Sequence, residues 1–248
     1  MFADIGEILI LLGRTLRALP RTWRQQRKVF EQLFEIGNAS LLMACVLSLF
    51  IGGVLALQTG PTLAEQGLQG FLGQIVGLAM CRELAPVMMA VLVAGRVGSA
   101  MAAEIGSMRV YQEIDALRTM NIDPVQYLVL PRIIAISVAL PLLVVFAILV
   151  GWLGGALVSH FNREIGLPFE GYFNSLSNGI EALDVVNGLL KSLAFAVVIG
   201  AVSCQQGLST VGGPRGIGRS VTKAVVNSIV LILLLDYFLT RVLMHLHT

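Results

Sequence analysis

The sequence predicts an all-α membrane protein, with an N-terminal interfacial helix followed by about five transmembrane helices. Of its 248 residues, 56% are hydrophobic and 13% are charged, and the mean hydropathy is +0.83. Soluble domains carry about 25% charged residues. The apolar residues fall in stretches of roughly twenty, the length that an α-helix needs to cross a bilayer. The formal net charge of only +2 argues against a nucleic-acid partner.

Residues 1–37 predict an interfacial amphipathic helix and a cytoplasmic lead-in. Apolar residues recur at helical spacing from Ile5 to Leu19, while charged residues occupy the opposite face. This pattern is typical of a helix that lies in the membrane interface. We expect Pro20 to end the helix and the charged segment 21–35 to lead into the membrane.

Residues 38–248 predict a transmembrane domain of five helices. The first span covers residues 39 to about 57 without any charge, and a turn signal, Thr59-Gly60-Pro61, follows it. The second span covers about residues 71–95. It contains Pro86, which should kink it.

Three further spans are expected at about residues 133–158, 185–204 and 224–243. The mixed, moderately polar segment 160–184 predicts a periplasmic excursion with short helical pieces. The glycine-rich segment 207–220 predicts a flexible cytoplasmic loop before the last span.

The distribution of basic residues predicts the orientation of the chain. Thirteen of the 17 Lys and Arg residues lie in three segments, 14–28, 96–132 and 215–223. Lys and Arg concentrate in cytoplasmic loops, so these segments should face the cytoplasm. The opposite side holds only Arg163, Lys191 and Arg241. With five spans, the N-terminus is expected inside and the C-terminus in the periplasm.

No motif in the chain predicts an enzyme. The string Gly213-Pro-Arg-Gly-Ile-Gly-Arg-Ser220 approaches the phosphate-binding P-loop pattern, but Arg219 stands where that pattern has Lys. The string also joins two predicted membrane spans, whereas a P-loop follows a buried strand. The three His and three Cys residues show no catalytic or metal-ligand spacing. We therefore expect no catalytic residue, metal site or cofactor in this chain.

Arg82 and Glu83 lie inside the second predicted span. Neighbouring residues on a helix point about 100° apart, so the two side chains should not pair with each other. A charge at this depth costs at least about 2.5 kcal/mol, so each should face a cavity or another span. Locking of spans and a role in the transport path are both compatible with the pattern. Asp236 in the fifth span is a candidate partner for Arg82.

Residues 99–132 form a polar region that is long for a simple turn. Apolar residues at helical spacing and charges of both signs predict a surface helix over residues 104–118. The string Asn121-Ile-Asp-Pro124 should end this helix. The pattern fits a solvated connector and a docking surface equally well.

Several motifs in order resemble the MlaE/YrbE permease family, and the resemblance covers most of the chain. These are Arg82-Glu-Leu-Ala-Pro86, Ala94-Gly-Arg-Val-Gly-Ser99, Ala103-Glu-Ile-Gly106, Glu113-Ile-Asp-Ala-Leu117, Asp123-Pro124 and Leu130-Pro-Arg132. The resemblance implies an ABC transporter permease in the bacterial inner membrane. It also implies transport of phospholipids between the inner and outer membranes, which maintains outer-membrane lipid asymmetry.

The resemblance also implies partners and sites. The partners would be a second copy of the chain, cytoplasmic ATPase subunits that bind ATP and Mg, and a periplasmic MCE-domain lipid-binding protein. The coupling helix that contacts the ATPase would contain Glu104, Ser107, Arg109, Glu113, Asp115 and Arg118. The lipid path would include Leu55, Thr62, Leu63, Gln66, Arg82 and Glu83.

Two other functions fit the residues without the resemblance. An ion-coupled secondary transporter would use Arg82, Glu83 and Asp236 as an ion relay, although the sequence shows no internal repeat of the kind common in such transporters. A non-transporting membrane scaffold would use residues 99–132 only to bind another protein.

Overall fold

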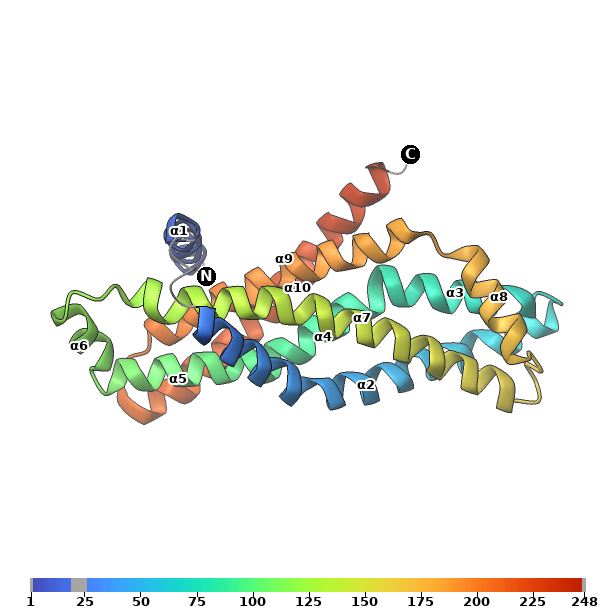
Figure 1. Cartoon of the computed structure of the whole chain (residues 1–248), viewed down its shortest axis with the longest axis horizontal. Helices are drawn as coiled ribbons and strands as arrows, with labels where there is room; N and C mark the ends of the chain where they lie inside the picture. Colours follow the sequence, from blue (N-terminus) through green and yellow to red (C-terminus); the bar gives the residue numbers. More distant parts are fainter. Residues whose placement is uncertain (1, 19–25, 247–248) are drawn as a thin grey trace. The chain divides into compact units, whose positions relative to one another are not determined.

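Helices form all the regular structure in residues 2–18 and 26–246, which are the residues that the computed structural model describes (Figure 1). Five helical segments are long and apolar enough to cross a membrane. They are Gln26–Glu65, Gln69–Val110, Val125–Phe161, Ala182–Leu208 and Gly213–Leu243. The prediction of an all-α membrane protein is confirmed, and the chain is a multi-pass membrane protein.

Ten α-helices lie in the described part of the chain. They are α1 (Phe2–Ala18), α2 (Gln26–Glu65), α3 (Leu72–Ala79), α4 (Ala85–Val93), α5 (Ser99–Val110), α6 (Glu113–Thr119), α7 (Leu130–Phe161), α8 (Phe169–Gly179), α9 (Ala182–Leu208) and α10 (Gly213–Leu246). Shorter turns adjoin them, namely the 3-10 turn η2 (Gln69–Phe71) and the π-helical turns η3 (Met80–Leu84), η4 (Ala94–Gly98) and η5 (Val125–Val129). Pro20, where we expected the first helix to end, lies outside the described residues.

Helix α2 corrects the predicted end of the first span. It continues to Glu65, so the expected turn at residues 59–61 is helical and Pro61 lies inside the helix. The hydroxyl of Thr59 donates to the carbonyl oxygen of Leu55 at 2.8 Å, so this side chain is accommodated within the helix. A helix satisfies backbone groups within one segment, which a membrane favours strongly enough to override local turn propensity.

The loop predicted over residues 207–220 is also much shorter than expected. Helix α9 continues to Leu208 and α10 begins at Gly213, which leaves only four connecting residues. Gly212 and Gly213 have φ angles of +93° and +69°, which glycine adopts without steric cost. Pro214 follows in the first turn of α10, where a missing N–H costs no helical hydrogen bond.

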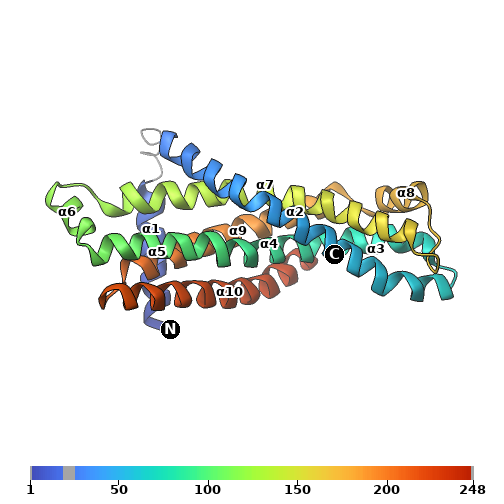
Figure 2. The ribbon, with the colours of Figure 1, turned by 90° about the horizontal axis from the view of Figure 1, so that it is seen from below.

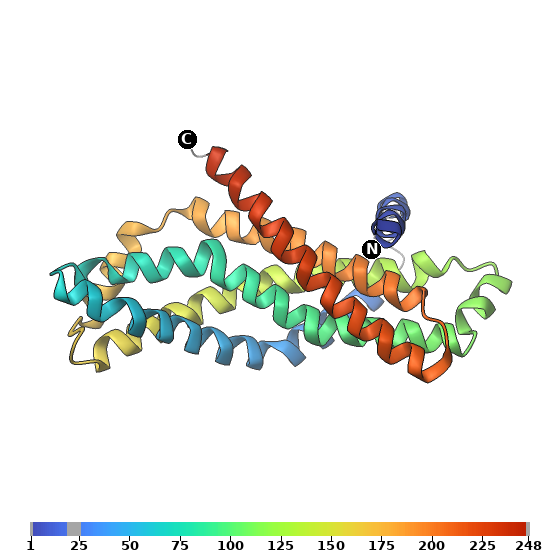
Figure 3. The same ribbon diagram turned by 180° about the vertical axis from the view of Figure 1, so that it is seen from behind.

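The chain forms two compact units. Unit 1 comprises residues 1–39, 90–140 and 193–248, and unit 2 comprises residues 40–89 and 141–192. In unit 1, α10 lies beside α5 (Figures 2 and 3). The main apolar cluster of unit 1 consists of Leu11, Ile105, Ile114, Val125, Leu128, Val129, Ile133 and Cys204.

Helix α1 belongs to unit 1 and is amphipathic, as its sequence predicts. Ile8 and Leu11 are buried, whereas Glu7 and Arg14 are exposed. Ile8 packs against Ala201 and neighbouring residues of α9, and Leu11 joins the main apolar cluster. Ile8 and Leu11 therefore attach α1 to the rest of unit 1, while the apolar side chains of Leu9 and Ile10 stay exposed.

Glycines set the helix packing in unit 2. A Cβ atom on Gly52 of α2 would overlap the carbonyl oxygen of Gly151 of α7, and one on Gly154 would overlap the carbonyl oxygen of Leu49. The backbones of α2 and α7 approach closely because both glycines lack a side chain. On another side of the unit, α8 lies beside α3 (Figure 1), and Tyr172 of α8 is fully buried.

Candidate functional site

The second span contains the π-helical turn η3. Here the backbone N–H of Ala85 donates to the carbonyl oxygen of Met80, five residues earlier. Pro86 follows and has no N–H, so it cannot donate to the carbonyl oxygen of Arg82, four residues earlier. Single π-helical turns inside α-helices are frequent at functional sites. The irregularity that we predicted from Pro86 therefore takes the form of this turn.

The charges of η3 are paired with residues of α9. Two guanidinium nitrogens of Arg82 lie 2.7 Å from the same carboxylate oxygen of Asp184. The ammonium of Lys191 donates to a carboxylate oxygen of Glu83 at 2.9 Å and to the carbonyl oxygen of Arg82 at 3.0 Å. Lys191 thus supplies the donor that Pro86 lacks.

Helix α9 presents its partners on one face. Asp184, Gly188 and Lys191 are spaced by four and three residues, which aligns them along the helix. A Cβ atom on Gly188 would overlap the carbonyl oxygen of Cys81, so the missing side chain lets α9 approach η3. The second carboxylate oxygen of Asp184 accepts a hydrogen bond from the backbone N–H of Glu181, which caps the start of α9.

Burial differs between the two ion pairs. The side chains of Lys191 and Asp184 are 3% and 6% exposed, whereas those of Glu83 and Arg82 are 40% and 55% exposed. A buried charge is strongly destabilising without its partner. We therefore interpret Lys191 and Asp184 as the groups that depend on the pairing, while Arg82 and Glu83 keep an open side.

The structure gives Arg82 a different carboxylate from the one that we expected. Its partner is Asp184, whereas Asp236 belongs to α10 in unit 1. From the sequence, Lys191 was expected only as a basic residue of the outer side. The signal that could have identified both partners is the shared face of Asp184, Gly188 and Lys191 in an otherwise apolar helix.

The other residues expected in the lipid path lie near the end of α2. Leu55 and Thr62 are seven residues apart and share a helix face. Thr62 is exposed, and Leu55 and Leu63 are partly buried. Gln66 is exposed just beyond the helix, in the turn before η2. The four residues, called the strip below, all belong to unit 2 and lie on the last part of α2 and just beyond it.

The region expected to form one helix over residues 104–118 is instead two helices, α5 and α6. They are separated at Tyr111 and Gln112, and Gln112 has a left-handed φ of 61°. A non-glycine residue in this conformation breaks a right-handed helix. Our prediction of a single surface helix was therefore wrong, because the helix breaks at Gln112, a point that apolar spacing alone does not mark.

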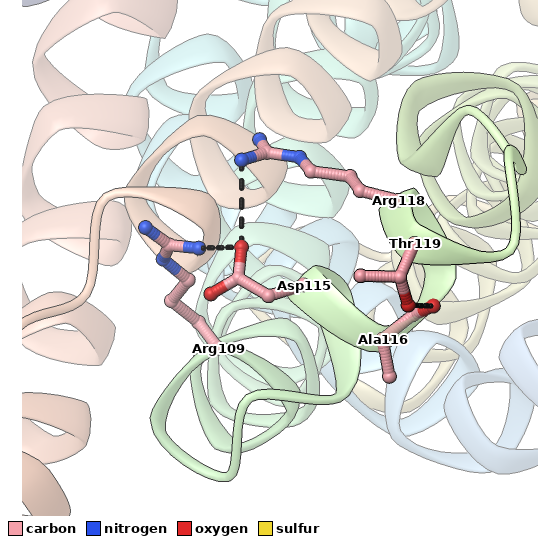
Figure 4. Close-up of polar contacts among 5 residues, drawn as sticks. All are labelled: Arg109, Asp115, Ala116, Arg118 and Thr119. Carbon is pink, nitrogen blue, oxygen red and sulfur yellow. Dashed lines mark hydrogen bonds and ion pairs between the residues drawn. The ribbon is translucent and has the colours of Figure 1, made fainter.

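Residues 109–119, from the end of α5 through α6, are called the tip below, and charged residues of the tip pair around Asp115 (Figure 4). A guanidinium nitrogen of Arg109 lies 2.8 Å from a carboxylate oxygen of Asp115, and one of Arg118 lies 3.5 Å from the same oxygen. Ile114 is fully buried in the main apolar cluster of unit 1. The tip is thus anchored by Ile114, with Leu117 packed against the same cluster, and it carries an exposed, mixed-charge surface that includes Glu113.

The remaining residues expected in the coupling helix lie on α5. Glu104 accepts a hydrogen bond from Arg132 at 2.8 Å, and the Arg132 side chain is only 11% exposed. Ser107 is partly buried, and its carbonyl oxygen accepts a hydrogen bond from the N–H of Tyr111. The ion pair of Glu104 and Arg132 therefore links α5, which precedes the tip, to the start of α7, which follows it.

Within the described part of the chain, no group of three or more His, Cys, Asp or Glu residues could hold a metal ion. The five long apolar helices, with ion pairs between two of them, define a polytopic helical membrane protein.

Comparison with known proteins identifies the family. Residues 29–242 match the family described as Permease MlaE. The chain therefore belongs to the MlaE permease family. A probable ABC transporter permease protein of Synechocystis is 40% identical over 96% of this chain and 90% of its own length.

Two further relatives have more specific names. The intermembrane phospholipid transport system permease protein MlaE of Haemophilus influenzae is 32% identical over 98% of this chain and 92% of its own length. The chloroplastic protein TRIGALACTOSYLDIACYLGLYCEROL 1 of Arabidopsis thaliana is 35% identical over 93% of this chain and 65% of its own length.

Proposed function

We propose that this chain is the membrane-spanning subunit of an ABC transporter that moves phospholipids between the inner and outer membranes of a bacterium. The observation that carries the proposal is the similarity to the Haemophilus phospholipid transport permease, which extends over 98% of this chain. In this role the complex maintains outer-membrane lipid asymmetry. ATP and Mg are bound by separate ATPase subunits.

The exposed tip supports docking of an ATPase. Charges of both signs lie on this short segment, which Ile114 anchors to unit 1; they belong to Arg109, Glu113, Asp115 and Arg118. A mixed-charge surface favours specific and correctly oriented association with a complementary partner. The tip is the part of α5 and α6 that we assign to coupling, and the pair of Glu104 and Arg132 would transmit its movement to α7.

The strip on α2 and the open sides of Arg82 and Glu83 support a lipid path in unit 2. Apolar Leu55 and Leu63 suit acyl chains, while Thr62 and Gln66 suit polar headgroup atoms. A second copy of the chain would close this path, and a periplasmic MCE-domain protein would exchange lipid with it. Pairing of Arg82 and Glu83 with α9 favours this role over an ion relay, because both charges already have fixed partners.

The distribution of charge supports a cytoplasmic N-terminus and a periplasmic C-terminus. Thirteen of the 17 Lys and Arg residues lie in the segments 14–28, 96–132 and 215–223, and the odd number of spans, five, puts the C-terminus on the side opposite to the N-terminus. The second of these segments contains the tip. Since basic residues concentrate on the cytoplasmic side, the tip would face the cytoplasm in the inner membrane.

Reconstitution tests the proposal. The chain, co-expressed with its ATPase, would be placed in proteoliposomes that contain a fluorescent phospholipid, and ATP-dependent lipid transfer would be measured. We expect transfer with ATP and a several-fold loss in Leu63→Gln, while Leu57→Gln, an exposed leucine of the same helix outside the strip, retains transfer. Transfer driven by a proton gradient without ATPase, or ATP-driven movement of polar solutes alone, would refute it.

A further inference from the structure

A cavity of about 460 Å³ lies in unit 1, outside the proposed lipid path. Its walls come from α1, α6, the segment before η5, and the end of α9. Four charged residues contribute to it, Glu7, Arg14, Arg118 and Asp123, and apolar residues such as Ile10 and Leu208 complete it. Apolar contacts of Ile8 and Leu11 hold α1 in place as one wall.

The carboxylates of the cavity already have hydrogen-bond donors. Glu7 accepts a short hydrogen bond from the side-chain amide of Gln205. Asp123 accepts a hydrogen bond from the backbone N–H of Val125 at 3.0 Å. Each carboxylate is therefore oriented by the protein and retains a second oxygen for another donor.

The guanidinium groups of Arg14 and Arg118 have N–H donors available for a ligand. Arg118 lies 3.5 Å from Asp115, the outer limit of a hydrogen bond. Arg14 is exposed, and it forms no ion pair with any residue that the structure describes. An arginine offers five N–H donors in a planar fork that suits a phosphate group.

The apolar part of the cavity lies one helical turn from Arg14. Ile10 precedes Arg14 by four residues, and Ile10 is 60% exposed. Its neighbour Leu9 is 64% exposed. An amphipathic helix of this kind buries its apolar side chains at the boundary between headgroups and acyl chains. The cavity therefore combines positive, negative and apolar side chains, the three kinds of group that a zwitterionic amphiphile can contact.

We propose that this cavity binds the headgroup of an amine-bearing zwitterionic phospholipid. The phosphate lies between Arg14 and Arg118, the ammonium group faces the free oxygens of Glu7 and Asp123, and the glycerol and upper acyl chain contact Ile10. Equal numbers of basic and acidic side chains favour a zwitterion over a simple anion. This lipid is a bound neighbour of the tip rather than cargo, so the inference goes beyond the proposed function.

Binding of a short-chain lipid tests the site. The full chain, purified and delipidated in detergent, would be titrated with dihexanoyl-phosphatidylethanolamine and analysed by native mass spectrometry. We expect Arg14→Ala to weaken binding about tenfold, the effect of losing one charge-assisted contact, and Arg14→Lys to weaken it less. The matched control is Arg27→Ala, which removes a 93% exposed arginine outside the cavity and should leave affinity unchanged.

Titrations with other ligands distinguish a lipid headgroup from free phosphate. Dihexanoyl-phosphatidylglycerol should bind several-fold more weakly than the ethanolamine lipid, and inorganic phosphate should not compete. Equal affinity for the two lipids, competition by phosphate, or an unchanged affinity in Arg14→Ala would overturn the proposal. Loss of binding in Leu63→Gln but not in Arg14→Ala would also overturn it, since the observed lipid would then occupy the transport path. Binding that depends on Arg14 in a chain without transport activity would instead refute only the proposed function.

Discussion

The ammonium group of Lys191 donates to the backbone carbonyl oxygen of Arg82 at 3.0 Å. Pro86 leaves that carbonyl without its usual helical donor, and Lys191 is only 3% exposed. One buried side chain therefore satisfies a backbone defect and also pairs with Glu83. The packing of α9 on the second span depends on this contact, because a backbone acceptor without a donor is costly within a membrane.

Lys191→Met should destabilise the protein strongly. The change leaves the carbonyl oxygen of Arg82 without this donor, and an unsatisfied buried acceptor costs about 1–3 kcal/mol. Glu83 also loses this cation, but its side chain is 40% exposed and can be solvated. The free energy of unfolding in mixed micelles measures the effect. Lys223→Met, at an exposed position of α10, is the matched control and should cost little. Equal stability of the two variants would show that the contact contributes nothing.

Gly188→Ala should also destabilise the protein, by separating α9 from η3. Its Cβ atom would overlap the carbonyl oxygen of Cys81, which belongs to the backbone and cannot move aside cheaply. Such overpacking costs about 1–3 kcal/mol. Gly218→Ala in α10 is the control, because no atom lies within 4 Å of the added Cβ. Alanine also favours a helix over glycine, so the control variant should be equally or more stable in the same unfolding assay.

Reversal of charge at the tip should uncouple the ATPase. In Arg109→Glu, two carboxylates would face each other where Arg109 now lies 2.8 Å from Asp115, and Glu113→Arg reverses a neighbouring exposed charge. We expect stimulated ATP hydrolysis to fall about tenfold in the double variant, since each 1.4 kcal/mol of lost association energy corresponds to a factor of ten. Arg27→Glu, which changes a 93% exposed side chain in the first turn of α2, is the matched control. If the double variant inserts normally and hydrolysis is unchanged, the tip has no coupling role.

Tyr172→Phe should stabilise the protein, most of all at alkaline pH. The hydroxyl of Tyr172 is buried and has no hydrogen-bond partner among the described residues. Removing such a group recovers about 1 kcal/mol. Burial also raises the pKa of the Tyr172 phenol, because desolvation disfavours the phenolate.

The direction of the pH effect follows from that shift. The folded chain keeps the phenol proton at pH values where the unfolded chain, with a pKa of about 10, has lost it. Stability from this group is therefore present below about pH 10 and is lost as the pH rises above it. Unfolding measured between neutral and alkaline pH should show a smaller loss in Tyr172→Phe than in the wild type. Tyr111→Phe, at a 69% exposed position, should behave like the wild type.

Much of the fold could be predicted because membrane insertion depends on composition and length. The apolar runs identified five spans, although local turn signals misplaced their ends. Pro61 lies inside α2, and the segment with Arg215 and Arg219 is the start of α10. In water, the backbone groups of a turn can form hydrogen bonds with solvent. In a bilayer they cannot, so each backbone N–H or C=O without a partner is costly and the helix continues.

The candidate sites were predicted less completely. Arg82 and Glu83 were visible as charges in an apolar run, but their partners Asp184 and Lys191 lie about 100 residues further along the chain. Their identity depends on which helix faces pack together. The tip likewise contains the expected charged residues, but the break between α5 and α6 depends on the left-handed backbone conformation of Gln112.

The sequence by itself determined the class of protein, the number of spans and the residues whose charge requires a partner. Each of these follows from the transfer energy of side chains between water and bilayer, which is a local property of the chain. Only the tertiary structure decided that Lys191 completes the backbone of η3, that Gly188 admits the contact, and that α5 and α6 form a tip. These features depend on how closely segments distant in sequence approach each other. The strength of a hydrogen bond and the cost of steric overlap both change when that separation changes by a fraction of an ångström.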